Sequence, residues 1–175
     1  MTLNIEIFEK KPEGFTPNVE VAGCYIEVEN KLLLLEYAST GTKSGKWGVP
    51  AGKVEKDETP LNAARRELFE ETAISLGCQS QIHYVNSMYI RKPDVDYIFH
   101  LFKVQLDQMP DVHLSHEHQS YRWATSQDIE EMPLVDAGKE ALQYYRTTQS
   151  DRNDSALCWV KAHQKEFYSE DGWKP

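Results

Sequence analysis

Two apolar runs separated by a short polar break stand near the beginning of the chain. The run over residues 19–28 predicts a β-strand, and the run over residues 31–37, with four consecutive leucines, predicts a second strand that is strongly buried. The break between them is the polar pair Glu29-Asn30, which favours a tight turn. The two runs therefore predict a β-hairpin.

A helix, further strands and two more helices follow along the chain. Thr59 and Pro60 form a typical helix start, with threonine as N-cap and proline in the first turn, and predict a helix over residues 60–72. The later pattern predicts strands over residues 81–91, 95–106 and 121–124, a helix capped by Ser126 that ends near Pro133, and a helix capped by Asp136 that ends near residue 146.

The two ends of the chain are less regular. Residues 1–18 predict an N-terminal arm or an edge strand, and residues 151–175 predict a C-terminal extension with one amphipathic helix. No repeat or linker interrupts the pattern, so residues 1–175 are expected to form one domain. The order strands, helix, strands, helices indicates an α+β fold in which a mixed β-sheet lies between helices.

Charge and cysteine content exclude several classes of protein. The 19 Lys and Arg against 28 Asp and Glu give a net charge of −9, which disfavours binding to duplex nucleic acid because that binding neutralises phosphates. No apolar run approaches the ~18 residues that span a bilayer, and no secretory signal is visible. Three widely spaced cysteines without a C-x-x-C motif favour free thiols in a reducing cytoplasm. We expect a cytoplasmic protein that does not bind membranes.

The helix predicted over residues 60–72 carries a crowded group of acidic residues. Its core face is formed by Leu61, Ala64, Leu68 and Thr72. Glu67, Glu70 and Glu71 share another arc, where like charges repel and where the helix end disfavours anions. A hard divalent cation, Mg²⁺ or Mn²⁺ in its place, would remove this conflict, because oxygen-only ligands select such ions. The alternative is a solvated acidic surface.

A longer motif surrounds these carboxylates. The segment from Gly52 to Ile74 resembles the Nudix box, G-x5-E-x7-R-E-U-x-E-E-x-G-U, in which U is aliphatic. Eight of the nine fixed positions match, namely Gly52, Glu58, Arg66, Glu67, Leu68, Glu70, Glu71 and Ile74. Ala73 stands where the box has glycine, at a helix end where a left-handed residue is often needed. Residues 47–53 also resemble the stretch that leads into Nudix boxes.

This resemblance to the Nudix hydrolases, and to their MutT-like branch, implies an α/β/α sandwich. It also implies hydrolysis of the pyrophosphate linkage in a nucleoside diphosphate joined to another moiety, with metal ions that neutralise the phosphates and activate water. The implied roles are Glu67 and Glu71 as metal ligands, Glu70 as a further ligand or base, the Ala51 carbonyl as a ligand, Arg66 as the residue that orients Glu67, and Glu58 as support for the loop–helix junction.

Glu117 is a second candidate for the base, and it is also a candidate metal ligand. It precedes the strand predicted over residues 121–124, a position that resembles the extra glutamate of several Nudix enzymes. His116 and His118 flank it and invite a zinc site, but alternation along an extended chain would point them away from Glu117. We therefore expect surface histidines near the mouth of the site.

The substrate is expected to be a nucleotide or a nucleotide sugar. Trp47 and Tyr89 could stack a base, and Arg91 with Lys92 could meet a distal phosphate. Asp136 resembles the residue with which the MutT-like branch reads the edge of a base. Each has a structural alternative, because aromatic residues in strands are mostly core and Asp136 suits a helix N-cap.

Two other functions are compatible with a Nudix-like fold. A non-catalytic nucleotide-sensing domain would usually have lost box carboxylates, whereas this chain keeps all of them. An isomerase of isoprenoid diphosphates needs a catalytic cysteine, and the setting of Cys24 does not resemble that pattern. The sequence favours a Mg²⁺-dependent pyrophosphohydrolase and leaves the oligomeric state open between a monomer and a homodimer.

Overall fold

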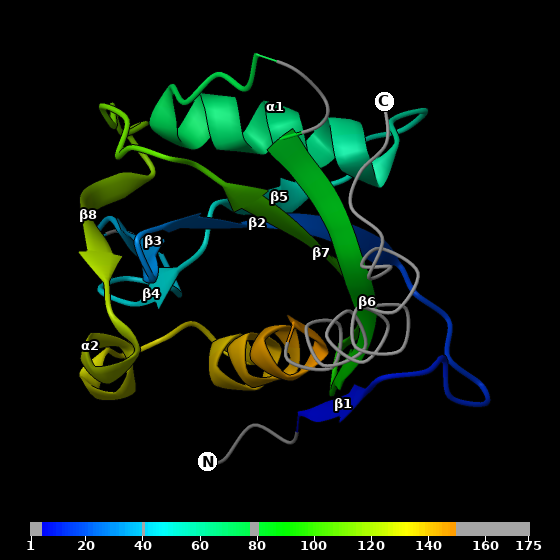
Figure 1. The fold of residues 1–175 in the computed structure, drawn as a ribbon. Coiled ribbons are helices and arrows are strands. Elements are labelled where there is room, and N and C mark those ends of the chain that lie inside the picture. The colour runs from blue at the N-terminus through cyan, green and yellow to red at the C-terminus, as the bar shows by residue number, and fades with distance from the viewer. Residues whose placement is uncertain (1–4, 40, 78–80, 150–175) are drawn as a thin grey trace, which may run out of the picture.

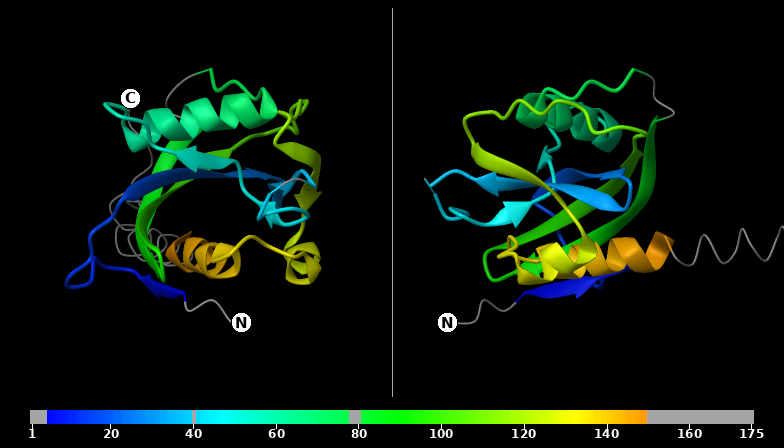
Figure 2. Two further views of the ribbon diagram at one scale, coloured as in Figure 1. Left: turned by 180° about the vertical axis from the view of Figure 1, so that it is seen from behind. Right: turned by 60° about the vertical axis from the view of Figure 1, so that its left-hand side comes forward.

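A central β-sheet separates two helical layers (Figure 1). The computed structural model of the protein describes residues 5–39, 41–77 and 81–149. Helix α1 (Pro60–Thr72) covers one face of the sheet, and helix α2 (Ser126–Glu131) and a helix over residues 138–149 cover the other. Figure 2 shows from two further directions that the two layers stay on opposite sides. The predicted α/β/α sandwich is confirmed.

The sheet is mixed. Within the described residues its strands are β1 (Glu6–Phe8), β2 (Val19–Val28), β3 (Lys31–Tyr37), β4 (Trp47–Gly48), β5 (Ala51–Lys53), β6 (Ile82–Lys92), β7 (Val95–Gln105) and β8 (His118–Ala124). Their order is β1-β6-β7-β2-β3-β4, with β5 paired to β2 and β8 paired to β3. Strands β2 and β7 run parallel, whereas β6 and β7 form an antiparallel hairpin.

Most of the predicted elements are confirmed. The bounds of β2, β3 and α1 agree with the predicted ranges, and β6 and β7 differ from theirs by one residue. Glu29 and Asn30 both have positive φ, 48° and 64°, as a two-residue hairpin turn requires. Strand β8 begins at His118 rather than Tyr121, because its pairing with β3 continues past an irregularity to Tyr37.

The leucines of β3 explain why the sheet has a core on both faces. Leu33 and Leu35 belong to the core beneath α1, together with Leu68 of that helix. Leu32 and Leu34 belong to the opposite core, which the helix over residues 138–149 closes with Leu142 and other side chains. Successive strand residues point to opposite faces, so a continuous apolar run is buried on both.

Two predicted helix caps are wrong, each by one residue. The N-cap of α2 is Thr125, whose hydroxyl accepts from the Asp128 N–H while the Asp128 carboxylate accepts from the Thr125 N–H. This reciprocal capping box explains why Thr125 rather than Ser126 begins the helix. In the last helix, the Ala137 carbonyl accepts from the Ala141 N–H, so residue 137, and not Asp136, takes the cap position.

The ends of the chain are described only in part. Residues 6–8 form the edge strand β1, paired with β6, which agrees with one of the two predictions for the N-terminal segment. The predicted amphipathic helix within 151–175, together with Cys78 and Cys158, lies outside the described residues. No helix of the described part is long and apolar enough to cross a bilayer.

Candidate active site

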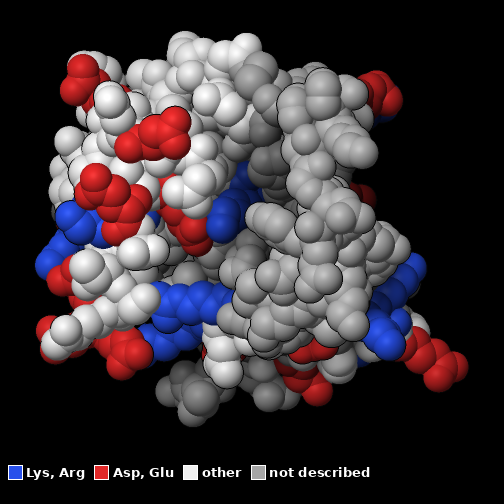
Figure 3. All heavy atoms as spheres, viewed as in Figure 1, with Lys and Arg blue, Asp and Glu red and all other residues white. Residues whose placement is uncertain are grey.

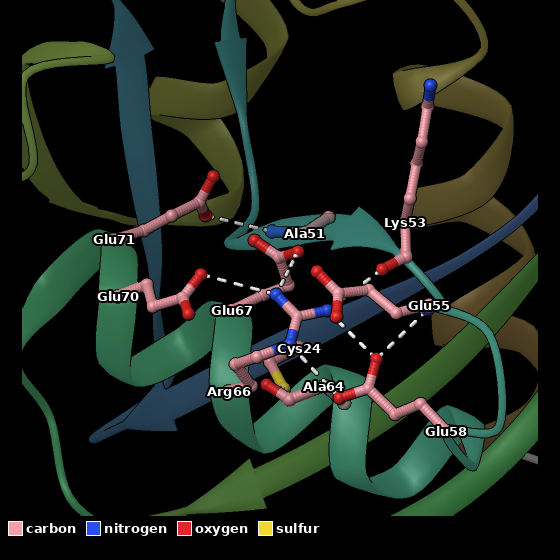
Figure 4. Close-up of polar contacts among 10 residues, drawn as sticks. All are labelled: Cys24, Ala51, Lys53, Glu55, Glu58, Ala64, Arg66, Glu67, Glu70 and Glu71. Atoms are coloured by element: carbon pink, nitrogen blue, oxygen red, sulfur yellow. Dashed lines mark hydrogen bonds and ion pairs between the residues drawn. The ribbon is translucent and has the colours of Figure 1, made fainter.

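The three glutamates of α1 differ sharply in exposure. The Glu70 side chain is 55% exposed, whereas those of Glu67 and Glu71 are 16% and 6% exposed. The cause is strand β5, which packs beside the helix and faces Glu67 and Glu71 (Figure 4). Two of the three carboxylates are therefore withdrawn from water, which contradicts a simple solvated acidic surface.

Arg66 ties the acidic group to the loop that precedes the helix. Its Nε and Nη2 donate to the two carboxylate oxygens of Glu58 at 3.0 and 2.9 Å, and Nη2 also donates to the Lys53 carbonyl. Its Nη1 donates to Glu67 at 2.7 Å and to Glu70 at 3.2 Å (Figure 4). The bidentate pair is thus made with Glu58, and one single bond orients Glu67.

Gly52 has a steric reason to be glycine. Its backbone lies directly under the Glu67 carboxylate, and a Cβ at this position would overlap that group. A residue without a side chain lets the carboxylate approach the β5 backbone closely. The first fixed position of the box is therefore explained by the packing of Glu67.

Glu71 is a buried carboxylate with little compensation. Its Oε2 accepts from the Ala51 N–H at 3.0 Å. Burial raises the pKa of Glu71 to about 8, the Ala51 hydrogen bond opposes this rise, and the charges of Glu67 and Glu117 add to it. Burial also raises the pKa of Glu67, against the effect of Arg66. The site concentrates negative charge that the protein alone does not neutralise.

Glu117 lies close enough to these carboxylates to affect them. It is exposed, in the turn before β8, and its charge raises the pKa of both Glu67 and Glu71. The backbone carbonyl of Glu117 accepts from the Ala38 N–H at 2.9 Å, which fixes this turn against the end of β3. The structure therefore brings the distal carboxylate to the box, as its sequence position suggested.

The prediction of surface histidines is wrong for His118. His116 is exposed, but His118 is buried, with its Nε2 3.8 Å from Glu71 Oε1 and its ring 4.7 Å from that of Tyr37. The reason is that β8 begins at His118 and turns this side chain inward, away from Glu117. Alternation along the chain was the signal that could have placed it on the buried side.

Cys24 is a core residue. Its thiol donates to the Ala64 carbonyl of α1 at 3.4 Å, and burial raises the pKa of this thiol to about 12. A thiol in this state is a poor nucleophile. The structure therefore offers no support for a catalytic role of Cys24.

A cavity of about 470 Å³ opens on the opposite side of the sheet from α1. Its lining includes apolar residues of β2, β3 and β7 and the start of the last helix, and it extends to Ala51, Gly52 and Lys53 of β5. Strand β5 therefore borders both the cavity and the carboxylates of α1. Trp47 and Asp136, two of the predicted substrate-binding residues, are among the residues that line this cavity.

Tyr89 and Arg91 are not among the residues that line the cavity. Tyr89 packs edge-on against Phe15 with the ring centroids 5.5 Å apart, and the Arg91 guanidinium binds the Asp96 carboxylate at 2.9 and 3.0 Å. Lys92 does line the cavity. Alternate residues of β6 face opposite sides of the sheet, so Tyr89 and Arg91 lie on the other face from Lys92.

Divalent metal chemistry fits the donor set of the box. The available groups are carboxylate oxygens and a backbone carbonyl, which hard cations prefer. Within the described ranges, no three His, Cys, Asp or Glu side chains already stand in an arrangement that could hold a metal ion. Arg66 donates hydrogen bonds to Glu67 and Glu70, and the Ala51 N–H donates to Glu71. Metal binding would therefore require the carboxylates to move away from these donors.

Comparison with known proteins assigns the chain to a family. The sequence model of the NUDIX domain matches residues 17–145. The chain belongs to the Nudix hydrolase family. Phosphatase NudJ of Escherichia coli (strain K12) is 33% identical over 142 residues, which cover 77% of this chain and 87% of NudJ.

Solved structures agree with this family. A MutT protein from Methanosarcina mazei Go1 is 26% identical, with a TM-score of 0.64 over 78% of this chain and 96% of its own. A bifunctional NMN adenylyltransferase/ADP ribose pyrophosphatase from Francisella tularensis, complexed with AMP and a manganese ion, is 22% identical, with a TM-score of 0.62 over 75% of this chain and 42% of its own. At that identity the second likeness shows the fold alone. The family match and the relatives together make the protein a Nudix hydrolase.

Proposed function

We propose that this Nudix hydrolase cleaves the pyrophosphate linkage of a nucleoside diphosphate joined to another moiety, with Mg²⁺ as its metal and Mn²⁺ as a substitute. One observation carries the proposal. The buried carboxylate of Glu71 and the half-buried carboxylate of Glu67 lie against β5, and residues Ala51–Lys53 of the same strand line the cavity. A substrate held in the cavity would thus bring its phosphates to the carboxylates.

Glu67 and Glu71 are the proposed principal metal ligands. Glu71 is buried and Glu67 is half-buried, and desolvation raises the pKa of both even though Arg66 pairs with Glu67. The Ala51 carbonyl, Glu70 and Glu117 are proposed as further ligands. The bound metal would neutralise charge on the phosphates and lower the pKa of a water molecule.

The remaining residues of the box position these groups. Arg66 holds Glu67 through one hydrogen bond and fixes the loop through Glu58 and the Lys53 carbonyl. Glu70 and Glu117 are the two proposed acceptors for the proton of the attacking water, because both are exposed near the buried pair. The water attacks phosphorus, and the bond between that phosphorus and the bridging oxygen breaks.

The cavity is proposed to hold the organic part of the substrate. Trp47 offers an aromatic side chain on its lining, and Asp136 stands at its edge. Tyr89 and Arg91 do not line the cavity and lie in the region around β1 and Phe15, so we assign them no part in substrate binding. A single domain over residues 1–175, a cytoplasmic location and a homodimer stay predictions.

The test is a panel of nucleoside diphosphate derivatives incubated with Mg²⁺, with products resolved by anion-exchange chromatography. We expect turnover of at least one compound, and a loss of at least about 10²-fold in Glu67→Gln, the scale of one lost transition-state contact. Glu130→Gln, an exposed glutamate of helix α2, is the matched control and should match wild type. Absence of turnover across the panel with both Mg²⁺ and Mn²⁺ would overturn the proposal.

A further inference from the structure

Three lysines gather on one side of the cavity around a single carboxylate. Lys46 Nζ lies 2.7 Å from Asp136 Oδ1, and Lys92 Nζ lies 3.7 Å from Asp136 Oδ2. Lys43 Nζ donates to the Tyr37 hydroxyl at 3.3 Å. All three lysines line the cavity, so this group carries three positive charges against one negative charge in a chain of net charge −9.

The position of Lys43 connects this group to the proposed catalytic carboxylates. Tyr37, which Lys43 contacts, has its ring 4.7 Å from that of His118, and His118 Nε2 lies 3.8 Å from Glu71 Oε1. The charges of Glu71 and Glu117 act on the Lys43 ammonium, and so do those of Lys92 and Asp136. Lys43 therefore lies near both the box and the other two lysines. Figure 3 shows a hollow in this face of the molecule, between the sheet and the lower helical layer, with basic side chains at its edges.

A structural role does not account for the excess of positive charge. One lysine suffices to pair Asp136, and partly exposed ion pairs of this kind contribute little stability. Lys92 places a second ammonium on the same carboxylate, and its positive charge acts unfavourably on Lys43, so a further anion in the cavity would stabilise the group. The three lysines therefore resemble an anion-binding site in which the Asp136 carboxylate takes the place of the anion.

We propose that Lys43, Lys46 and Lys92 form a second phosphate subsite, which binds a phosphate of the substrate that does not lie on the box carboxylates. In the absence of substrate, the Asp136 carboxylate pairs with Lys46 and Lys92. A substrate phosphate would replace the carboxylate as the partner of these lysines. The inference rests on the proposed hydrolase function and narrows its substrate class. It selects nucleotides that end in a chain of phosphates, such as nucleoside triphosphates, over nucleotide sugars.

The charge of the ligand decides this choice. A lysine ammonium is a compact cation with three donors that suits a phosphate group. A terminal phosphate carries enough negative charge to compete with the Asp136 carboxylate for the two ammonium groups. The hydroxyls of a sugar are neutral and leave that ion pair in place. Asp136 is thereby a specificity residue rather than a reader of the base, because its two oxygens already face cations.

The first test compares KM for a nucleoside triphosphate and a nucleotide sugar in the double variant Lys46→Gln/Lys92→Gln. We expect KM for the triphosphate to rise about tenfold or more, the scale of a lost hydrogen bond to a charged group, with the nucleotide sugar changed less than about twofold. Lys103→Gln is the matched control, because Lys103 forms a 3.0 Å ion pair with Glu27 outside the cavity lining.

A second test has the opposite sign and needs no turnover. Asp136→Asn removes the resident counter-ion and keeps the lysines, so inorganic tripolyphosphate should bind this variant several-fold more tightly than wild type in metal-free calorimetry. The double lysine variant should bind it more weakly. If Asp136 reads a base instead, Asp136→Asn would leave tripolyphosphate binding unchanged and alter the preference between bases.

The outcomes separate this inference from the function on which it rests. Wild-type turnover with equal changes of KM for the triphosphate and the nucleotide sugar in the double variant would overturn the subsite and leave the hydrolase function intact. Unchanged tripolyphosphate binding in both variants would do the same. A panel without any wild-type turnover would overturn the hydrolase function, while the calorimetry would still decide whether the lysines bind a phosphate chain.

Discussion

Replacing Glu71 by glutamine separates a metal ligand from a structural residue. The exchange keeps the shape of the side chain and an oxygen that can accept from the Ala51 N–H at the same place. It removes a carboxyl group that can ionise beside Glu67. In the metal-free protein burial disfavours the ionised form of this group, whereas a bound divalent cation would need it.

The free-energy cost of burying the Glu71 carboxyl group follows from its pKa. Burial raises the pKa of Glu71 to about 8 from an ordinary value of 4.5. The native state therefore holds a proton that the unfolded chain has released between those two pH values, and stability falls as pH rises through this window. At pH 7 the cost amounts to about 3 kcal/mol, which glutamine does not incur. Below pH 4 the cost disappears, because both states are protonated.

Unfolding in urea with EDTA measures this difference. At pH 7 we expect Glu71→Gln to be more stable than wild type by up to about 3 kcal/mol, or roughly 6–12 °C in melting temperature for a chain of this size. At pH 4 the two proteins should have equal stability within error. The other titrating groups are the same in both proteins, so their effects cancel in the difference between variant and wild type. With Mg²⁺ at pH 7 the variant should lose at least about 10²-fold in activity.

Two results would refute the reasoning. A stability difference that is the same at pH 4 and pH 7 would show that Glu71 is not a buried carboxylate of raised pKa. Activity above a tenth of wild type would remove Glu71 from the metal ligands, and the hydrolase chemistry would then depend on the remaining carboxylates.

Three further outcomes test other parts of the site. Mg²⁺ or Mn²⁺ at 100 times the dissociation constant should raise the free energy of unfolding of wild type by about 2.7 kcal/mol and so raise its melting temperature, and an unmoved melting curve would contradict an ordered site. Glu117→Gln should lower kcat by about 10²–10⁴ without loss of folding if Glu117 is the base, and a kcat within threefold of wild type would reassign that role to Glu70. Ala73→Gly should raise stability by up to about 1 kcal/mol in urea unfolding, because Ala73 has φ 58°, and a lower stability would contradict strain there.

Local signals explain what the sequence could predict of the fold. Thr59 as N-cap, Pro60 in the first turn and a regular apolar spacing determine α1 without help from the rest of the chain. The polar pair Glu29-Asn30 does the same for the hairpin of β2 and β3, because it interrupts two apolar runs and its asparagine is among the residues favoured at positive φ. Elements of this kind depend on neighbours along the chain.

Elements that depend on distant partners were predicted less well. Strand β8 begins at His118 because β3 offers pairing partners as far as Tyr37. The residues next to His118 in the sequence do not indicate where this strand starts. Of the two residues expected to meet a distal phosphate, Lys92 lines the cavity and Arg91 does not, for a related reason. Strand β6 shifts register near Tyr84 and Asn86, so the side of the sheet that each later residue faces is set by pairing with β7.

The site itself shows where a helical pattern stops being informative. Spacing alone places Glu67, Glu70 and Glu71 on one flank of α1 and treats them alike. Strand β5 distinguishes them, because it reaches Glu67 through the bare backbone of Gly52 and reaches Glu71 through the Ala51 N–H. Glu70 pairs with Arg66 at 3.2 Å and stays exposed to water. The division of roles among equally spaced carboxylates is thus decided by a short strand that no residue of the helix encodes, and this makes burial, rather than spacing, the observation on which the proposed metal ligands depend.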